Sequence, residues 1–202
     1  MKVSLSNCLL SYIDNRGVTP KKLKGEFINH PNGYRVLSAN NVKSTGLVKT
    51  NEIRFVDKEL YCKWMSEEIS RGDILLTSEA PAGEIMYWDS DEKIVVGQRL
   101  YALRVNPKIV DSLYLSYYLK SYKGQAEIKK NITGSTVFGI SQKTFDNITI
   151  DLPNLSTQKK IAKILKDIDD QIQRNNEMVQ KLPSSGNTIS CIFKNGGNAY
   201  VY

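Results

Sequence analysis

The feature that most constrains the fold is the run of residues 156–182, which contains neither glycine nor proline. Within this run, apolar side chains recur at alternating spacings of four and three. This alternation is the heptad pattern of a helix whose narrow apolar seam pairs with another helix. The alternative is an amphipathic helix that lies on the chain's own core. We favour the first interpretation because the seam is narrow and continues past the last predicted strand. The expected interface residues are Ile161, Leu165, Ile168, Ile172, Asn175, Val179 and Leu182.

The region before Pro153 has a different pattern, that of a globular α/β domain. Short runs of β-branched and aromatic residues, bounded by Gly, Pro, Asn and Asp, predict strands. Helices are expected over 58–69 and after the N-cap residue Asp111, with Gly124 ending or kinking the second one. We therefore predict a mixed α/β (α+β) fold, with a globular domain over 1–153, a long helix over 154–182, and a tail or small hairpin over 183–202. The predicted strands are 34–37, 53–56, 73–77, 85–88, 94–96, 100–105 and 148–152.

The formal charge of +7 is unevenly distributed along the chain. Residues 16–49 carry seven basic side chains and one acidic, and residues 93–143 carry nine basic and two acidic. The intervening residues 50–92 carry four basic and eleven acidic. If the fold brings the two basic segments together, they form a positive face suited to a polyanion such as nucleic acid. The alternative is a solvated basic surface without a partner.

This chain lacks the residues that most classes of enzyme require for catalysis. One histidine and three scattered cysteines make a zinc site or a His-dependent nucleophile improbable. The same cysteine usage, with no apolar run long enough to span a membrane, indicates a reducing cytoplasm. A phosphate-binding GxxxxGK[ST] loop is absent, as are the cofactor loop and target-base tetrapeptide of a DNA methyltransferase. A metal nuclease that uses Asp89, Asp91 and Glu92 is the remaining enzyme hypothesis, although their WDSDEK segment is typical of a turn.

Three polar loops inside or beside the basic segments are the candidates for contact with DNA. They are the segments 15–26, 38–46 and 131–141, the last of which follows two lysines. Asn can read adenine, Arg or Lys can read guanine, and Ser, Thr and Lys can bind phosphates. The predicted DNA-binding residues are Arg16, Lys21, Lys22, Lys24, Asn40, Asn41, Lys43, Arg99, Lys129, Lys130, Ser135 and Thr136.

Four tyrosines near the second predicted helix allow two interpretations. Tyr114, Tyr117, Tyr118 and Tyr122 could stack on nucleic-acid bases. Their helical spacing instead favours packing in the core, above all for Tyr118 and Tyr122.

Five segments in order make the chain similar to the specificity subunits of type I restriction–modification systems, over about residues 9–182. The last segment is the most specific, because its Gly-Ser/Thr loop, its strand, Leu152-Pro153, Gln158 and the apolar seam follow the usual order of the family. The five segments are IDNRGVTP (13–20), VLSANNVKSTGLV (36–48), SRGDILLTSEAPAGEI (70–85), VVGQRLYALRV (95–105) and ITGSTVFGISQKTFDNITIDLPNLSTQKKIAKILKDIDDQI (132–172).

The resemblance implies a non-catalytic subunit that binds double-stranded DNA through a target-recognition domain, here residues 1–153. Such subunits usually carry two recognition domains and two long helices, which pair antiparallel and set the spacing of a bipartite target. Methyltransferase subunits that bind S-adenosylmethionine dock around them, and an endonuclease subunit joins in some complexes. The chain itself is expected to hold no cofactor or metal.

This sequence departs from that pattern because it has one recognition domain and one helix, as a half-length form would. An exposed apolar seam is costly in water, so we expect an antiparallel homodimer with twofold symmetry. Its DNA target would be a palindrome with an unspecified middle. The other hypothesis is an adaptor that binds protein through a coiled coil and has no DNA specificity. The tail over 183–202 has no counterpart in the resemblance.

Overall fold

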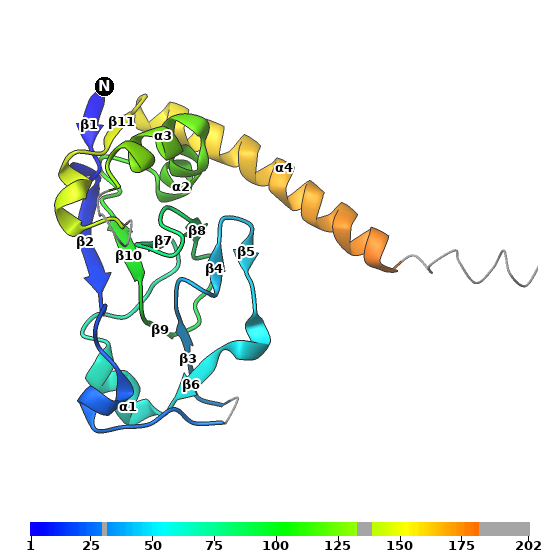
Figure 1. Ribbon diagram of the computed structural model, residues 1–202. Helices are drawn as coiled ribbons and strands as arrows, with labels where there is room; N and C mark the ends of the chain where they lie inside the picture. Colours follow the sequence, from blue (N-terminus) through cyan, green and yellow to red (C-terminus); the bar gives the residue numbers. More distant parts are fainter. Residues whose placement is uncertain (30–31, 133–138, 182–202) are drawn as a thin grey trace, which may run out of the picture. The chain divides into compact units, whose positions relative to one another are not determined.

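A computed structural model describes residues 1–29, 32–132 and 139–181 (Figure 1). The chain divides into two units, Met1–Ala162 and Lys163–Tyr202. Every strand that the structure describes lies in the first unit. The mixed α/β class expected from the sequence is confirmed, and each of the seven predicted strands is present with its ends within one residue of the prediction.

The centre of the first unit is an antiparallel sheet in which β10 (Leu100–Val105) lies between β2 (Leu9–Asp14) and β7 (Ile74–Thr77), with β8 (Ile85–Tyr87) beyond β7. Successive side chains of a strand point to opposite faces of a sheet. Tyr101 and Leu103 accordingly enter one hydrophobic core, while Leu100 and Ala102 enter another. The sheet is therefore buried on both faces, which explains why β10 shows no polar alternation in the sequence.

Helices α2 (Ser112–Lys120) and α3 (Tyr122–Lys130) cover the first core. The expectation that Gly124 ends or kinks a single helix is wrong. The break falls at Ser121, whose backbone is extended and whose hydroxyl accepts a hydrogen bond from the N–H of Gly124. Gly124 lies inside α3, where a Cβ would come within 2.1 Å of the carbonyl oxygen of Tyr118. The glycine thus permits the close approach of the two helices.

The pairing of β1 (Lys2–Ser4) with β11 (Thr149–Asp151) closes the same core from the side, so the two ends of the globular part lie together. The amino group of Met1 donates a hydrogen bond to the carbonyl of Leu152 at 2.8 Å. The sequence did not predict β1, because three residues with partly exposed side chains carry no recognisable alternation.

The second core lies under a three-stranded sheet of β6 (Arg54–Val56), β3 (Tyr34–Leu37) and β9 (Ile94–Val96), in that order. Strand β3 runs antiparallel to β6 and parallel to β9. Helix α1 (Lys58–Trp64) packs here and is shorter than the predicted 58–69, because the N–H of Met65 closes the last turn and the chain then extends. Its N-cap is Asp57, whose carboxylate accepts from the N–H of Leu60 at 2.8 Å.

Short elements complete the connections between the strands. Strands β4 (Val42–Lys43) and β5 (Gly46–Leu47) form a hairpin that contacts β8. Four 3-10 turns occur in the described ranges, and the sequence had predicted none of these elements. They are η1 (Ser6–Cys8), η2 (Pro20–Leu23), η3 (Thr50–Glu52) and η4 (Gln142–Asp146).

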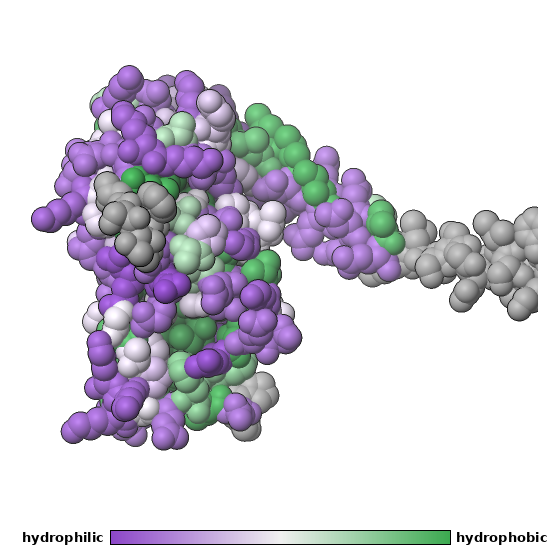
Figure 2. All heavy atoms as spheres, in the orientation of Figure 1, coloured by the Kyte–Doolittle hydropathy of each residue, from purple (hydrophilic) through white to green (hydrophobic). Residues whose placement is uncertain are grey.

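Helix α4 (Leu155–Lys181) confirms the long helix, and its first two turns belong to the first unit. The buried side chain of Gln158 accepts from the N–H of Asp111 at 2.9 Å and donates to the carbonyl of Pro153 at 2.8 Å. Beyond Ala162 the helix carries a row of exposed apolar side chains, seen in green in Figure 2. Leu182 and the predicted tail lie outside the described residues. None of the described helices combines the length and hydrophobicity of a membrane span.

Candidate nucleic-acid interface

A groove of about 520 Å³ opens in the first unit where segments far apart in the sequence meet. Buried Pro20, Ala39 and Trp64 line it together with exposed Asn40 and Arg99. Two of the predicted DNA-binding loops, 15–26 and 38–46, therefore share one surface with Arg99. The groove combines apolar area with polar and cationic side chains, which is the composition that base edges and phosphates require.

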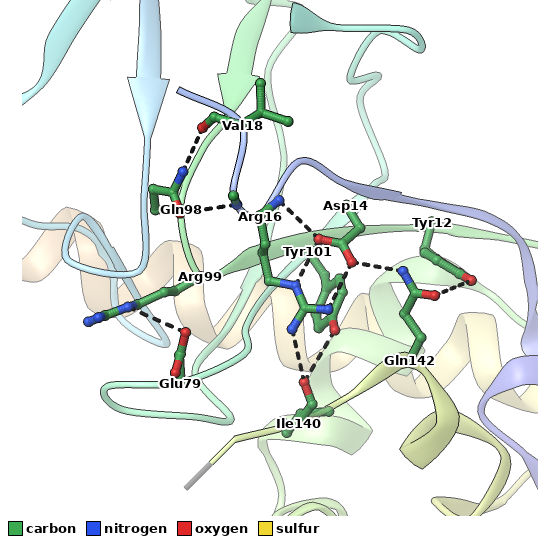
Figure 3. Close-up of polar contacts among 11 residues, drawn as sticks. Tyr12, Asp14, Arg16, Val18, Glu79, Gln98, Arg99, Tyr101, Ile140 and Gln142 are labelled. Carbon is green, nitrogen blue, oxygen red and sulfur yellow. Dashed lines mark hydrogen bonds and ion pairs between the residues drawn. The ribbon is translucent and has the colours of Figure 1, made fainter. Parts of the chain in front are cut away.

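Gln98 forms hydrogen bonds with two of the segments that line this groove (Figure 3). Its side-chain oxygen accepts a hydrogen bond from the N–H of Gly17 at 3.2 Å, and its amide donates to the carbonyl of Val18 at 2.6 Å. Its main-chain carbonyl accepts from the N–H of Ala39 at 3.2 Å. Sequence reasoning did not select Gln98, and its only signal was the turn between two predicted strands.

Arg16 is held by its neighbours and lies flat over the ring of Tyr101, 4.2 Å from the ring centre (Figure 3). Its guanidinium donates to both carboxylate oxygens of Asp14 at 2.8 and 2.9 Å. Burial raises the pKa of Asp14, but hydrogen bonds from Arg16 and Gln142 outweigh it and leave that pKa below its ordinary value. The charge of Arg16 is thus compensated within the chain, and its contact with DNA stays a prediction.

Arg99 lies in the turn between β9 and β10 with a left-handed backbone, φ 60°. Its guanidinium pairs with Glu79 at 3.4 Å, while its side chain remains 53% exposed. The carbonyl of Arg99 accepts from the N–H of Ser78, and the carbonyl of Ser78 in turn accepts from the N–H of Ile140. These two hydrogen bonds bring residues 139–141, the end of the third predicted loop, next to Ser78 and Arg99 at one end of strands β7 and β10.

The two predicted asparagines have different surroundings. Asn40 is exposed and lines the groove. Asn41 is 6% exposed, and its side-chain oxygen accepts from the N–H of Ser38 at 3.2 Å and from its hydroxyl at 2.9 Å. Asn41 therefore shapes the loop, whereas Asn40 has the accessibility that a base contact needs.

The three lysines of the first loop follow Pro20 along η2 and are exposed. The turn is capped by Thr19, whose hydroxyl accepts from the N–H of Lys22, and the ammonium of Lys22 donates to the carbonyl of Gly17 at 2.6 Å. No carboxylate lies within ion-pair distance of Lys21, Lys22 or Lys24 among the described residues. Their positive charge is available to an outside anion.

Lys43, on the β4–β5 hairpin, is paired with Glu84, a residue that sequence reasoning did not select. Its ammonium lies 3.4 Å from the carboxylate of Glu84. Glu84 also accepts from the N–H and the hydroxyl of Ser44, both at 2.8 Å. Burial raises the pKa of Glu84, but the hydrogen bonds from Ser44 and the charge of Lys43 outweigh it, so the pKa is lowered. Glu84 therefore anchors the hairpin to β8.

We expect Glu84→Gln to destabilise the fold by about 1.5 kcal/mol at pH 7, because hydrogen bonds to a charged acceptor are lost. The pKa is lower in the folded chain than in the unfolded one, so this stabilisation is present above about pH 4.3 and lost as the pH falls through the folded pKa. Urea unfolding of both proteins from pH 7 to pH 3 measures the difference. Glu79→Gln removes one ion pair, to the 53% exposed Arg99, and should change stability by less than about 0.5 kcal/mol. A difference for Glu84→Gln that stays constant with pH would contradict the assignment.

The remaining predicted residues are less informative. Lys129 and Lys130 are exposed at the end of α3, and neither is among the described residues that line the groove. Ser135 and Thr136 lie outside the described residues.

Of the four tyrosines, Tyr114 packs in the core, but Tyr122 is 91% exposed, so its expected core packing is wrong. The break at Ser121 turns Tyr122 away from the register of α2.

The acids proposed for a nuclease are paired with arginines. Arg71 binds Asp89 and Asp91, and Arg35 binds Glu92. Among the described residues, no three His, Cys, Asp or Glu side chains are placed to hold a metal ion. These carboxylates act as partners for cations of the same unit.

The pairing extends to most carboxylates of the acidic segment 50–92, which lie beside cations of the basic segments. Arg104 binds Glu67 and the buried Asp73, and Lys93 binds Glu68 at 2.7 Å. Much of the positive charge counted along the sequence is thereby neutralised. Among the described arginines of the first unit, Arg54 has no carboxylate within ion-pair distance. It lines the groove, so an uncompensated guanidinium lies where the predicted loops meet.

Comparison with known proteins identifies the class to which this fold belongs. The family profile described as the type I restriction modification DNA specificity domain matches residues 13–184. Two solved structures share the fold. One, from a study of the assembly and conformational transition of the type I R-M system, has a TM-score of 0.64 at 20% identity and covers 88% of this chain and 40% of the other. The S subunit from M. genitalium has a TM-score of 0.61 at 16% identity and covers 89% and 41%.

The chain therefore belongs to the family of type I restriction–modification DNA specificity domains. The MjaVIII specificity subunit of Methanocaldococcus jannaschii is 36% identical over 115 residues, which are 56% of this chain and 26% of that protein. The EcoKI specificity subunit of Escherichia coli is 26% identical over 172 residues, 83% of this chain and 36% of that protein. This chain thus spans between a quarter and two fifths of these relatives. The family match favours DNA recognition over the adaptor hypothesis.

Proposed function

We propose that this chain is a non-catalytic DNA specificity subunit that reads one half of a bipartite target in a type I restriction–modification complex. The observation that carries the proposal is the groove. It joins predicted DNA-binding loops 15–26 and 38–46 in a member of the specificity-domain family. Arg54, which has no carboxylate partner among the described residues, lines it, and the exposed lysines of η2 directly follow the lining residue Pro20. Lys21, Lys22 and Lys24 supply phosphate contacts that raise affinity for any sequence. Asn40 has the position and the exposure to contact base edges.

We infer that a second copy covers the apolar seam of α4. The seam residues Ile168 and Ile172 are about half exposed, at 47% and 52%, and the adjacent Ile164 is 60% exposed. Antiparallel coiled coils place an a position opposite a d position. With the dyad between Lys166 and Asp167, Ile161 faces Ile172 of the second copy and Leu165 faces Ile168. These four positions are therefore complementary to themselves in the antiparallel direction, and two recognition units joined in this way would read a palindrome with an unspecified middle.

The complex that follows from this proposal also contains methyltransferase subunits, which would bind S-adenosylmethionine, and in some forms an endonuclease subunit. No residue of this chain is assigned to the cofactor or to a chemical step. Such a complex acts on cellular DNA, so the proposed location is the cytoplasm.

Selection from random duplex DNA with the purified chain tests the proposal. We expect enrichment of a palindrome whose two short half-sites are separated by unspecified bases. We also expect light scattering to give twice the mass of the 22.8 kDa chain. Binding without any preferred sequence would refute DNA specificity, and a monomer at tens of micromolar would refute the homodimer alone.

A further inference from the structure

One side chain of the groove stands apart from the predicted DNA-binding set. Arg54 begins β6 and pairs with Val36 of β3. Residues directly opposite each other in neighbouring strands point to the same face of the sheet. Val36 lines the groove, so Arg54 projects over the same hollow, which both residues border.

Phe27 fixes the orientation of the guanidinium of Arg54. The N–H of the next residue, Ile28, donates to the carbonyl of Phe55 at 2.9 Å, which holds Phe27 beside the start of β6. The Cζ atom of Arg54 then lies 4.8 Å from the centre of the Phe27 ring. Contact with an aromatic face occupies the flat side of a guanidinium and leaves its N–H groups free to donate in the plane.

The other arginines of the first unit are already occupied. Arg16, Arg35, Arg71, Arg99 and Arg104 each have a carboxylate partner within the chain. A carboxylate uses the same fork of donors that would bind a guanine edge or a phosphate. In the described part of the first unit, Arg54 is thus the arginine held in a defined orientation without such a partner. Glu52 also lines the groove, but its carboxylate is 3.9 Å from the ammonium of Lys49.

We propose that Arg54, held by Phe27 at the edge of the groove, is a specificity-determining residue that binds a guanine of the DNA target. The proposal rests on the proposed function. Two parallel N–H groups of an arginine match the O6 and N7 acceptors of guanine in the major groove. The ammonium of lysine can also donate to guanine, but it lacks this rigid planar fork and the stacking on an aromatic ring that orients it. Arg54 lies in the segment 50–92, whose net charge is negative, so the charge pattern gave no reason to select it.

The test measures the affinity of the full chain for its selected target and for random duplex DNA. Arg54→Lys keeps the charge but loses the fork. It should weaken binding at each half-site by about 5- to 150-fold, so the affinity of the dimer for the palindrome falls by the square of that factor. Binding to random DNA should stay within about twofold. Repeating the selection should give a motif that has lost one guanine in each half-site. Phe27→Leu should weaken target binding in the same selective manner but less strongly.

Arg71→Ala is the matched control, because Arg71 is exposed but paired with Asp89 and Asp91. It should change neither affinity, and thermal melting should show all variants folded. An unchanged motif for Arg54→Lys would overturn the proposal and leave the proposed function intact. If Arg54→Ala reduced the affinity for target and random DNA equally, the proposal would also be overturned, because Arg54 would then contact phosphate. If the wild-type chain prefers no sequence, the proposed function itself fails, and this inference with it.

Discussion

Replacing Leu165 with Asp should convert the protein from a dimer to a monomer. In the proposed antiparallel pairing, Leu165 contacts Ile168 of the second copy, so the variant places a charge in an apolar seam at two symmetric sites. An uncompensated buried charge costs about 3 kcal/mol or more, and two of them raise the dissociation constant by roughly 10⁴-fold. Light scattering at micromolar concentration should then give the mass of one chain. Affinity for the palindromic target should fall to that of a single half-site.

The matched control for this variant is Lys163→Asp, which places the same side chain two residues away, on an exposed position outside the seam. It should leave the dimer intact. The first unit includes only the first two turns of α4, so melting of that unit should be similar in both variants. A dimer that survives Leu165→Asp would show that the contact between copies lies elsewhere.

Replacing Lys21, Lys22 and Lys24 together with Ala should have the second large effect. These lysines have no carboxylate partners in the described residues, so each is free to displace a counterion from DNA. For each bound chain, the plot of log affinity against log salt should become less steep by about 2 to 3 units, and affinity at 0.15 M salt should fall by roughly 10- to 100-fold. The loss should be similar for target and random DNA, because phosphate contacts carry no sequence information.

A second triple variant, Lys2→Ala, Lys58→Ala and Lys108→Ala, removes the same charge from exposed positions outside the groove. Its salt dependence should stay close to that of the wild type. Equal slopes for the two triple variants would mean that overall charge, rather than the surface beside the groove, determines DNA affinity.

The elements that could be predicted from the sequence are those with strong local patterns. The β9 segment is apolar throughout and the β10 segment is apolar except for Arg104, and α4 repeats its apolar residues over about five turns. These elements were therefore recognisable without a structure. The prediction placed the break between α2 and α3 at Gly124, because glycine is a common helix breaker, whereas Ser121 caps α3. The β4–β5 hairpin has two-residue strands, for which no periodic signal exists.

The site was predictable in outline, through its loops and lysines, but not in its details. Whether an arginine is free depends on which carboxylate lies beside it in space, and these partners are far apart in the sequence, as Arg35 and Glu92 show. For the same reason Arg54 was overlooked in an acidic segment, and Gln98 and Glu84 had no visible role. Their importance arises from hydrogen bonds between segments, which local spacing does not encode.

The central claim is that this chain determines which DNA sequence its complex modifies. Methylome sequencing of the source cell, with and without the gene for this chain, tests that claim most directly. The account predicts that one bipartite methylated motif disappears when the gene is deleted and returns when the gene is restored. An unchanged set of methylated motifs after deletion would contradict it.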